Sequence, residues 1–266
     1  MVMSDRMSTH NIVHLTPFFL KGEILLAQTL FFARSVFPHL PTHIVASGEA
    51  IWKYLPSGLP RDLEKRALVV LKRQPHAREF VWRNYLAGSL ARALKEGADP
   101  YDLFLDRNLP LMHHFPQAIL TPTEKSEDDK PLKTRHVVRQ CKGAVHLTRQ
   151  AVEVSTAYLR TRNIALIDTK LEADEEMLLD EFMTGDCSRM AEQDKIEEGK
   201  EPPFLDKEPV RKMAEQKWKG GPKVPLEFSD SETAMGIWNY HRAFEMITDV
   251  PLHVFQQTAL SYEKHL

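Results

Sequence analysis

The residues best suited to chemistry gather between Asp168 and Arg189, where the sequence reads DTKLEADEEMLLDEFMTGDCSR. Residues 164–172 have the alternating pattern of a β-strand, in which successive side chains point to opposite faces. We therefore expect Asp168, Lys170 and Glu172 to share one face. Ile164 and Leu166 should lie earlier on that face, with Ile167 and Leu171 on the other.

A second strand is predicted over residues 176–183, so that the two strands form a hairpin across an acidic link. Asp180 and Glu181 in this second strand point to opposite faces, and only one of them can join the charges of the first strand. Beyond Gly185 the chain continues with an aspartate, a serine and Arg189. The hairpin thus concentrates carboxylates around one lysine, with an arginine close by.

This combination of charges is typical of phosphoryl chemistry. One or two carboxylates together with phosphate oxygens suit Mg²⁺, and lysine and arginine suit an anionic substrate. In such reactions, positioning and charge neutralisation supply most of the catalysis. The alternative is a solvated hairpin with a polar outer face, a common arrangement. The apolar ALI and MLL runs favour buried strands, whose terminal acids need a partner or a metal.

A second candidate anion site lies around Arg83, where Asn84 and the turn Ala87-Gly88-Ser89 follow. Such a turn can present a guanidinium, a hydroxyl and backbone N–H groups to an anion. By itself this pattern is better explained by an ordinary surface arginine beside a turn. The sequence contains no HExxH, GxGxxG or GxxxxGK[ST] motif, so a zincin, Rossmann or P-loop interpretation has no support.

The surrounding sequence mixes helices and strands without a regular βαβ alternation, which favours an α+β fold. Residues 99–134 hold five prolines and are predicted to run over the surface, as binding loops often do. A second loop is expected at 192–209. Apolar spacing and turn residues predict the following elements: helices over 22–37, 135–162, 210–219 and 231–246, and strands over 66–72, 79–86, 164–172 and 176–183.

Composition excludes several classes of protein. The 266 residues include 35 Lys plus Arg and 37 Asp plus Glu, a net charge of −2, with 42% hydrophobic and 27% charged residues. A disordered chain is excluded, and there is no global field to attract nucleic acid or anionic membrane. The longest apolar stretch, 24–33, is about half of the ~20 residues that a spanning helix needs. Two cysteines cannot build a disulfide framework, and without CxxC spacing no zinc site with thiolates is expected. With no signal-peptide pattern either, a cytoplasmic protein is predicted.

Taken together, these residues resemble the phosphoribosylaminoimidazole-succinocarboxamide synthase (SAICAR synthetase) family. LIDTKLE followed by LLDEFMTGDCSR is similar to the signature pair of that family. Further similar blocks occur in the same order along nearly the whole chain: SDRMS at 4–8, KG at 21–22, VWRNYLAGSL at 81–90, TPTEKSEDD at 121–129 and PFLDKEPVR at 203–211. Any one block is weak evidence, but the collinear set is strong.

The resemblance implies an ATP-dependent ligase of de novo purine biosynthesis. It would join L-aspartate to the carboxylate of carboxyaminoimidazole ribotide (CAIR), through an acyl phosphate, with ATP and Mg²⁺ as cofactors. The implied fold has a small β-rich N-terminal lobe, a larger α+β lobe and ATP in the cleft. We place these lobes at 1–77 and 78–266. The family is usually oligomeric, so a homo-oligomer is expected.

The resemblance also implies roles for individual residues. Arg83, Ser89 and Arg189 would hold the phosphate of the ribotide, and Lys170 and Asp168 would act near the CAIR carboxylate. The remaining assignments are these: Lys170, Glu172 and Asp180 to ATP, Glu172 and Asp180 to Mg²⁺, and Lys125 and Asp129 to the aspartate or CAIR subsite.

Some family features differ here. The glycine-rich GK-x-RD-x-Y segment that covers the ATP phosphates has no counterpart, the final acid of SDRISAFD is Asn11, and the HD of the loop is Asp128-Asp129. These differences predict weak ATP binding, an open sheet edge that favours self-association, and a start codon further upstream. They leave two alternatives: a kinase or ligase of this fold acting on another phosphorylated metabolite, or a non-catalytic ribotide-binding homologue.

Overall fold

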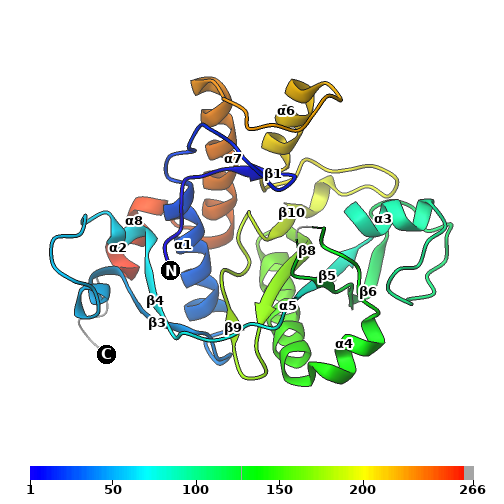
Figure 1. Ribbon diagram of the computed structural model, residues 1–266, viewed down its shortest axis with the longest axis horizontal. Coiled ribbons are helices and arrows are strands. Elements are labelled where there is room, and N and C mark those ends of the chain that lie inside the picture. Colours follow the sequence, from blue (N-terminus) through cyan, green and yellow to red (C-terminus); the bar gives the residue numbers. More distant parts are fainter. Residues whose placement is uncertain (127, 261–266) are drawn as a thin grey trace.

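A mostly antiparallel sheet forms the centre of the computed structural model, which describes residues 1–126 and 128–260. Its strands lie in the order β10 (Ser188–Glu192), β8 (Ile164–Ala173), β5 (Arg78–Tyr85) and β6 (His114–Leu120). Each neighbouring pair is antiparallel. Two short strands extend it, because β7 (Thr123–Glu124) pairs with β5 and β9 (Leu178–Leu179) pairs with β8. The sheet occupies the right half of Figure 1.

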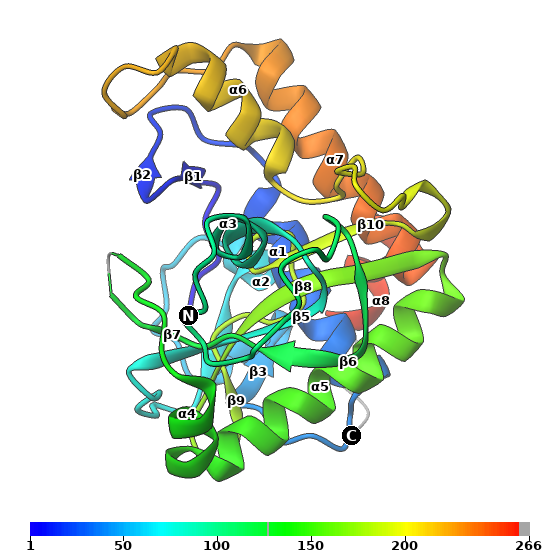
Figure 2. The same cartoon turned by 90° about the vertical axis from the view of Figure 1, so that its right-hand side faces the viewer.

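The long helix α5 (Lys142–Thr161) packs along β8 and β5. Its buried residues, which include Leu147, Ala151 and Leu159, form one stripe, as expected for an amphipathic helix. A polar contact adds to this packing, since the indole N–H of Trp82 donates to Thr148 Oγ1 at 3.0 Å. Figure 2 shows α5 along one side of the sheet, with the helix at residues 208–218 at the opposite end of the molecule.

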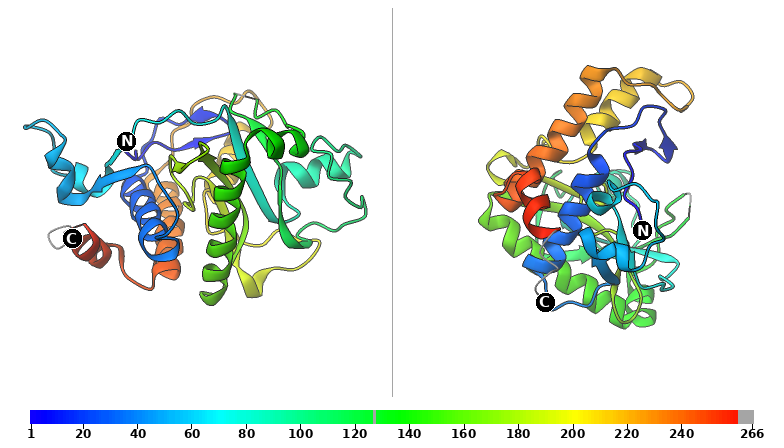
Figure 3. Two further views of the ribbon diagram at one scale, coloured as in Figure 1. Left: turned by 90° about the horizontal axis from the view of Figure 1, so that it is seen from below. Right: turned by 90° about the vertical axis from the view of Figure 1, so that its left-hand side faces the viewer.

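Helices from the two ends of the sequence pack together. The helix α1 (Lys21–Phe31), extended by a π-helical turn at Phe32–Val36, contacts α7 (Asp230–Thr248) and α8 (Leu252–Ala259). Buried apolar side chains from all three α-helices, among them Leu26, Phe244 and Phe255, belong to one cluster. The helices lie side by side in Figure 3. Residues of the N-terminal segment therefore share a core with the C-terminal helices.

The remaining elements are short or lie at the periphery. The helix α6 (Glu208–Trp218) packs against α7, and α3 (Gly88–Lys95) and α4 (Thr134–Gln140) flank the sheet. The others are as follows: β1 (Ser8–Thr9) pairs with β2 (Ile12–Val13), β3 (Ile44–Ser47) with β4 (Leu68–Val70), α2 covers Leu63–Arg66, and 3-10 turns cover Gly48–Lys53 and Gln193–Lys195.

The α+β class and most predicted elements are confirmed. The prediction of a surface excursion over 99–134 is wrong in part, because it contains β6, a strand of the central sheet. The predicted strand over 176–183 shrinks to two residues, and β10 supplies the longer second partner of β8 instead. The predicted helix over 135–162 divides at Cys141 into α4 and α5.

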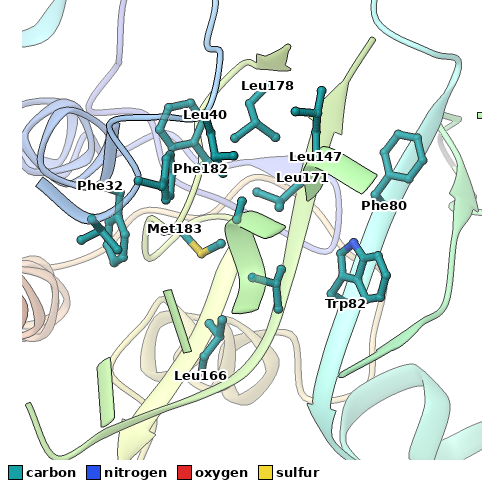
Figure 4. Packing of buried hydrophobic residues seen from close by; sticks show 14 of the residues in the cluster. Phe32, Leu40, Phe80, Trp82, Leu147, Leu166, Leu171, Leu178, Phe182 and Met183 are labelled. Atoms are coloured by element: carbon teal, nitrogen blue, oxygen red, sulfur yellow. The ribbon is translucent and has the colours of Figure 1, made fainter. Parts of the chain in front are cut away.

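The expected faces of β8 are also wrong in its first half. Leu166 and Leu171 pack in the same core cluster, while Ile167 lies in a different one. The cause is a shift of register, because Arg189 pairs with Asp168 but the next residue, Met190, pairs with Leu166. One extra residue on β8 reverses the alternation at this point. Figure 4 shows Leu166 and Leu171 beside Trp82 and Met183 in this core.

Beyond that bulge the expected pattern holds. Leu171 and Ala173 are buried in the main core, so Asp168, Lys170 and Glu172 lie on the opposite face of β8. This face carries the charges that the sequence singled out.

Candidate functional site

A buried cluster of two arginines and one aspartate is the most densely connected part of the site. Asp168 on β8 lies in register with Arg83 on β5 and Arg189 on β10. Its Oδ2 accepts from Arg83 Nη1 at 2.5 Å, and its Oδ1 accepts from Arg189 Nε at 2.9 Å. Sheet pairing thus brings together three residues that are up to 106 positions apart in the sequence, counted from Arg83 to Arg189.

The guanidinium of Arg83 is fixed on several sides. Its Nε donates to Thr121 Oγ1 at 2.9 Å, and its Nη2 donates to Ser89 Oγ at 2.9 Å. Arg83 is 4% exposed and Asp168 is 7% exposed, whereas Ser89 is exposed. The hydrogen bond from Arg83 to Ser89 therefore connects the buried Arg83–Asp168 pair to the protein surface.

Gly88 explains how Arg189 reaches the same place. Gly88 has a φ of +58°, and a Cβ built on it would lie 2.5 Å from Arg189 Nη2. Only glycine accommodates both this backbone conformation and the close approach. Arg189 also lies over the ring of Phe204, 5.7 Å from its centroid. The guanidinium is therefore held against the start of α3.

Electrostatics in this cluster favour the binding of an anion. Burial disfavours the charged carboxylate of Asp168, but Arg189 and Arg83 outweigh burial and hold its pKa below the ordinary value of 3.8. Burial opposes the charge on Arg189 too, yet Asp168 raises the pKa of that guanidinium. Two guanidiniums against one carboxylate leave an excess positive charge beside the Ser89 hydroxyl and the N-terminus of α3, which suits a phosphate.

Lys170 is the next charged residue along the same face. Its Nζ lies 2.7 Å from Oε1 of the buried Glu79, whose Oε2 accepts from Thr123 Oγ1 at 3.0 Å. Burial opposes the charge on Lys170, but the hydrogen bond to Glu79 outweighs it and raises the pKa of the lysine. Asp129 faces the same pair, and partial desolvation together with the charge of Glu79 raises its pKa.

Glu172, the last of the three charged residues on β8, forms an ion pair with Lys125. Its side chain is 12% exposed, and that of Lys125 is 44% exposed. Leu179 of β9 is the register partner of Glu172, so Asp180 lies one residue beyond that position and is exposed. Asp180 has a φ of +58° and lies outside β9, so strand alternation does not orient it.

A third polar cluster ties the N-terminal segment to this region. Asp186 Oδ2 forms an ion pair with the ammonium of Lys21 at 2.7 Å, and its Oδ1 accepts a hydrogen bond from the hydroxyl of Tyr240 at 2.6 Å. Asp5 Oδ1 accepts the backbone N–H of Gly22, the residue after Lys21, at 2.9 Å. Glu181 faces this cluster rather than the charges on β8, and burial and the charge of Asp186 raise its pKa to about 7.

The structure thus brings the predicted residues together in two groups, Arg83, Ser89, Asp168 and Arg189 in one, and Lys170, Asp129, Glu172 and Lys125 in the other. Sequence reasoning missed Glu79 and Thr121. Glu79 could have been found, because it lies four residues before Arg83 on the same strand and hence on the same face. Thr121 begins the block at 121–129, but its contact with Arg83 had no local signal, since it depends on the pairing of β6 with β5.

No helix in residues 1–126 and 128–260 is both long enough and apolar enough to cross a bilayer.

Comparisons with known proteins agree on one class, the carbon–nitrogen ligases of purine biosynthesis. The sequence profile of the SAICAR synthetase family matches residues 1–225. The phosphoribosylaminoimidazole-succinocarboxamide synthase of Actinobacillus succinogenes is 30% identical, over 93% of this chain and 91% of its own length. The enzyme of Neisseria meningitidis serogroup B is 31% identical, over 85% of this chain and 84% of its own length.

Solved structures show the same fold. A SAICAR synthase from Saccharomyces cerevisiae in complex with SAICAR has a TM-score of 0.80 at 22% identity, and the match covers 94% of this chain and 88% of the yeast chain. A SAICAR synthetase in complex with ADP has a TM-score of 0.64 at 19% identity, with coverage of 94% and 91%. The chain described here belongs to the SAICAR synthetase family.

Proposed function

We propose that this chain performs the ligase reaction of its family with the phosphate of the ribotide bound at Arg83, Ser89 and Arg189. In that reaction, L-aspartate is joined to the carboxylate of CAIR through an acyl phosphate, and ATP is cleaved to ADP and phosphate. The observation that carries the assignment is the convergence of two guanidiniums and an exposed hydroxyl at the start of α3. This donor set matches the oxygens of a phosphate monoester.

Asp168 contributes by holding both arginines in place. Its carboxylate is saturated by guanidinium hydrogen bonds from two sides. Lys170 lies two residues further along the same face, with its ammonium charged and positioned by Glu79. We assign Lys170 to the CAIR carboxylate and to the phosphate transferred to it, because a fixed cation stabilises the negative charge that gathers there.

Mg²⁺ would be held by Glu172 and Asp180. Both offer carboxylate oxygens, which are the ligands that Mg²⁺ prefers, and Asp180 follows Leu179, the register partner of Glu172. Glu172 is bound to Lys125, whose exposed side chain can move away. The ion would neutralise the charge on the ATP phosphates. Lys125 and Asp129 lie nearby on the loop after β7, and we assign them to the aspartate or CAIR subsite.

The same proposal includes a cytoplasmic, homo-oligomeric enzyme whose partners are small anions rather than nucleic acid. The net charge of −2 supports the last point. The division into lobes at residues 1–77 and 78–266 remains part of it.

The decisive experiment measures ADP release by the purified protein with ATP, Mg²⁺, CAIR and aspartate. We expect turnover only when both co-substrates are present. Turnover without aspartate would point to a kinase acting on CAIR or another phosphorylated metabolite. The absence of turnover, with ribotide binding retained, would indicate a non-catalytic homologue.

Two variants test the residue assignments. Ser89→Ala should raise the KM for CAIR about tenfold or more and leave the KM for ATP unchanged, because it removes one hydrogen bond to a charged group.

Asp180→Asn should lower Mg²⁺-dependent turnover by about 10²–10³, while circular dichroism should show an unchanged fold. An equal effect of Ser89→Ala on both KM values, or unchanged turnover in Asp180→Asn, would contradict the respective assignment.

A further inference from the structure

Three potential metal ligands meet at a place that the ligase reaction does not use. They are His76, from the segment between β4 and β5; Cys141, at the junction of α4 and α5; and Glu175, in the turn between β8 and β9. One ligand atom from each lies within 4.8 Å of the other two. Cys141 is buried, His76 is half-buried and Glu175 is exposed, so the group opens to solvent on one side.

Each ligand is held by contacts of its own. The carboxylate of Glu175 accepts the backbone N–H of Gly143 at 2.6 Å on Oε2, and this leaves Oε1 facing His76 Nε2 at 2.8 Å. A Cβ on Gly143 would lie 2.7 Å from Glu175 Oε2, so glycine is needed for this approach. The backbone N–H of His76 donates to Ala173 O at 3.2 Å. In the folded protein a Glu175 oxygen, a His76 nitrogen and the Cys141 sulfur are therefore already close together.

We propose that His76, Cys141 and Glu175 form a binding site for Zn²⁺ or a similar divalent transition metal. Thiolate, imidazole and carboxylate are the ligands that zinc takes in proteins, usually in tetrahedral geometry. With three protein ligands, the fourth position falls to water on the open side. Mg²⁺ would not select this site, because it prefers oxygen ligands.

The distances are close to what zinc requires. Bonds of about 2.1 Å in a tetrahedral site separate neighbouring nitrogen and oxygen ligands by roughly 3.4 Å. The His76 and Glu175 atoms, 2.8 Å apart, must therefore open by roughly 0.6 Å. The Cys141 sulfur, within 4.8 Å of both, must approach by at most about 1.2 Å. Such movements are within the reach of side-chain torsions.

Arg78 is the competitor for this site. Its Nη1 lies 2.8 Å from Cys141 Sγ, and its Nη2 lies 2.5 Å from the side-chain oxygen of Gln140. The sulfur therefore already faces a positive charge. Metal binding must displace this guanidinium toward Gln140, and for that reason removal of Arg78 should strengthen binding.

A metal ion at this site would strengthen the connections of the turn between β8 and β9 to its neighbours. Arg73 forms ion pairs with Asp174 and Glu176, on either side of Glu175. The contact between His76 and Glu175 already joins the segment at 73–76 to this turn, and the Gly143–Glu175 hydrogen bond joins the turn to α5. A metal ion would replace the first contact with coordination and would add Cys141 as a further link to the start of α5. Metal binding should therefore stabilise the folded protein.

Titration of the purified full-length protein with Co²⁺ tests the proposal. Cobalt takes zinc sites, and coordination by a thiolate adds an absorption band in the near ultraviolet. We expect this band in the wild type, its loss in Cys141→Ser and its retention in Cys187→Ser, the matched control at the second cysteine. Absence of the band in the wild type, or its persistence in Cys141→Ser, would overturn the proposal.

Thermal unfolding with Zn²⁺ provides a second readout that does not depend on activity. At about ten times the Kd, Zn²⁺ should raise the Tm of the wild type by about 3 °C, and should not raise that of Cys141→Ser. Arg78→Ala should bind Co²⁺ at least about tenfold more tightly than the wild type. An equal rise in Tm for wild type and Cys141→Ser would mean binding by surface groups only, and would refute the site.

Discussion

Asp168 is the centre of a buried ion-pair triad with Arg83 and Arg189. It is 7% exposed and lies between two guanidiniums, which are 5% and 17% exposed in their side chains. A buried ion pair contributes little net stability relative to apolar packing, but removal of one partner leaves an uncompensated charge. The triad therefore fixes the positions of both guanidiniums, and the loss of Asp168 should destabilise the protein.

We expect Asp168→Asn to lower the free energy of unfolding by about 3–5 kcal/mol, because both arginines lose their counter-charge in a buried place. Urea unfolding at pH 7 measures this change. Glu201→Gln is the control, since it alters an exposed ion pair with Lys212 at 3.6 Å and should change the value by less than about 0.5 kcal/mol. Equal stability of Asp168→Asn and the wild type would show that the arginines are compensated elsewhere.

Asp206 is a second buried acid, and it predicts how stability depends on pH. Burial raises its pKa to about 7, although the backbone N–H of Glu208 and the charge of Arg189 act in the opposite direction. The folded protein keeps this proton up to about pH 7, while an unfolded chain releases it near the ordinary value of 3.8. Between these values the folded state binds more protons, so its stability falls as the pH rises.

Asp206→Asn should remove part of this fall. The loss of unfolding free energy between pH 5 and pH 7.5 should be smaller in the variant by on the order of 2 kcal/mol, as measured by urea unfolding at each pH. Asp194→Asn, at an exposed acid, should behave like the wild type. A variant with the same pH dependence as the wild type would mean that Asp206 is ionised throughout this range.

At the scale of elements, the start of α3 depends on its contact with β10. The helix begins at Gly88, and the space that a side chain would occupy there is filled by Arg189. The pairing of β10 with β8 brings that arginine to the helix. A loop, a helix and a strand thus meet at the surface that we propose binds the phosphate of the ribotide.

Gly88→Ala should raise the KM for CAIR about tenfold or more and leave the KM for ATP unchanged, because the new methyl group displaces the guanidinium by its contact at 2.5 Å. Gly58→Ala is the matched control. Gly58 also has a positive φ, of +89°, but has no atom within 4 Å of the added Cβ. Gly58→Ala should lower the stability of the protein without changing either KM. An equal rise in the KM for CAIR in both variants would refute the specific role of Gly88.

At the scale of the whole molecule, the cluster around Asp186 links segments that are far apart in the sequence. Lys21 begins α1, Asp186 lies just before β10, and Tyr240 lies within α7. All three meet through two hydrogen-bonded carboxylate oxygens. Gly185 permits this approach, since a Cβ there would lie 2.9 Å from the ring of Tyr240.

Tyr240→Phe should therefore lower the free energy of unfolding by about 1.5–3 kcal/mol, the value of a hydrogen bond to a charged group. Chemical denaturation measures the loss. Tyr54→Phe, at a side chain that is 56% exposed, should be neutral within about 0.5 kcal/mol. If the two variants are equally stable, Lys21 alone suffices to hold Asp186.

The sequence by itself determined the α+β class, the approximate places of α1, α5, α6, α7, β5 and β8, and the residue types at the anion site. These follow from local rules: the period of apolar residues, the breaking of helices by proline, and the alternation along a strand. The charged end of β8 was therefore visible, as was the arginine in β5. The collinear blocks added the family.

Tertiary structure decided which of these residues meet. The sequence indicated a hairpin partner for β8 over 176–183, but β10 became the longer partner, and its register shift moved Leu166 to the face opposite Asp168. Strand pairing and bulges depend on which apolar surfaces can be buried together, and no short segment contains that information. For the same reason, the contacts of Glu79 with Lys170 and of Lys21 with Asp186 join positions 91 and 165 residues apart, and emerged only from the folded chain.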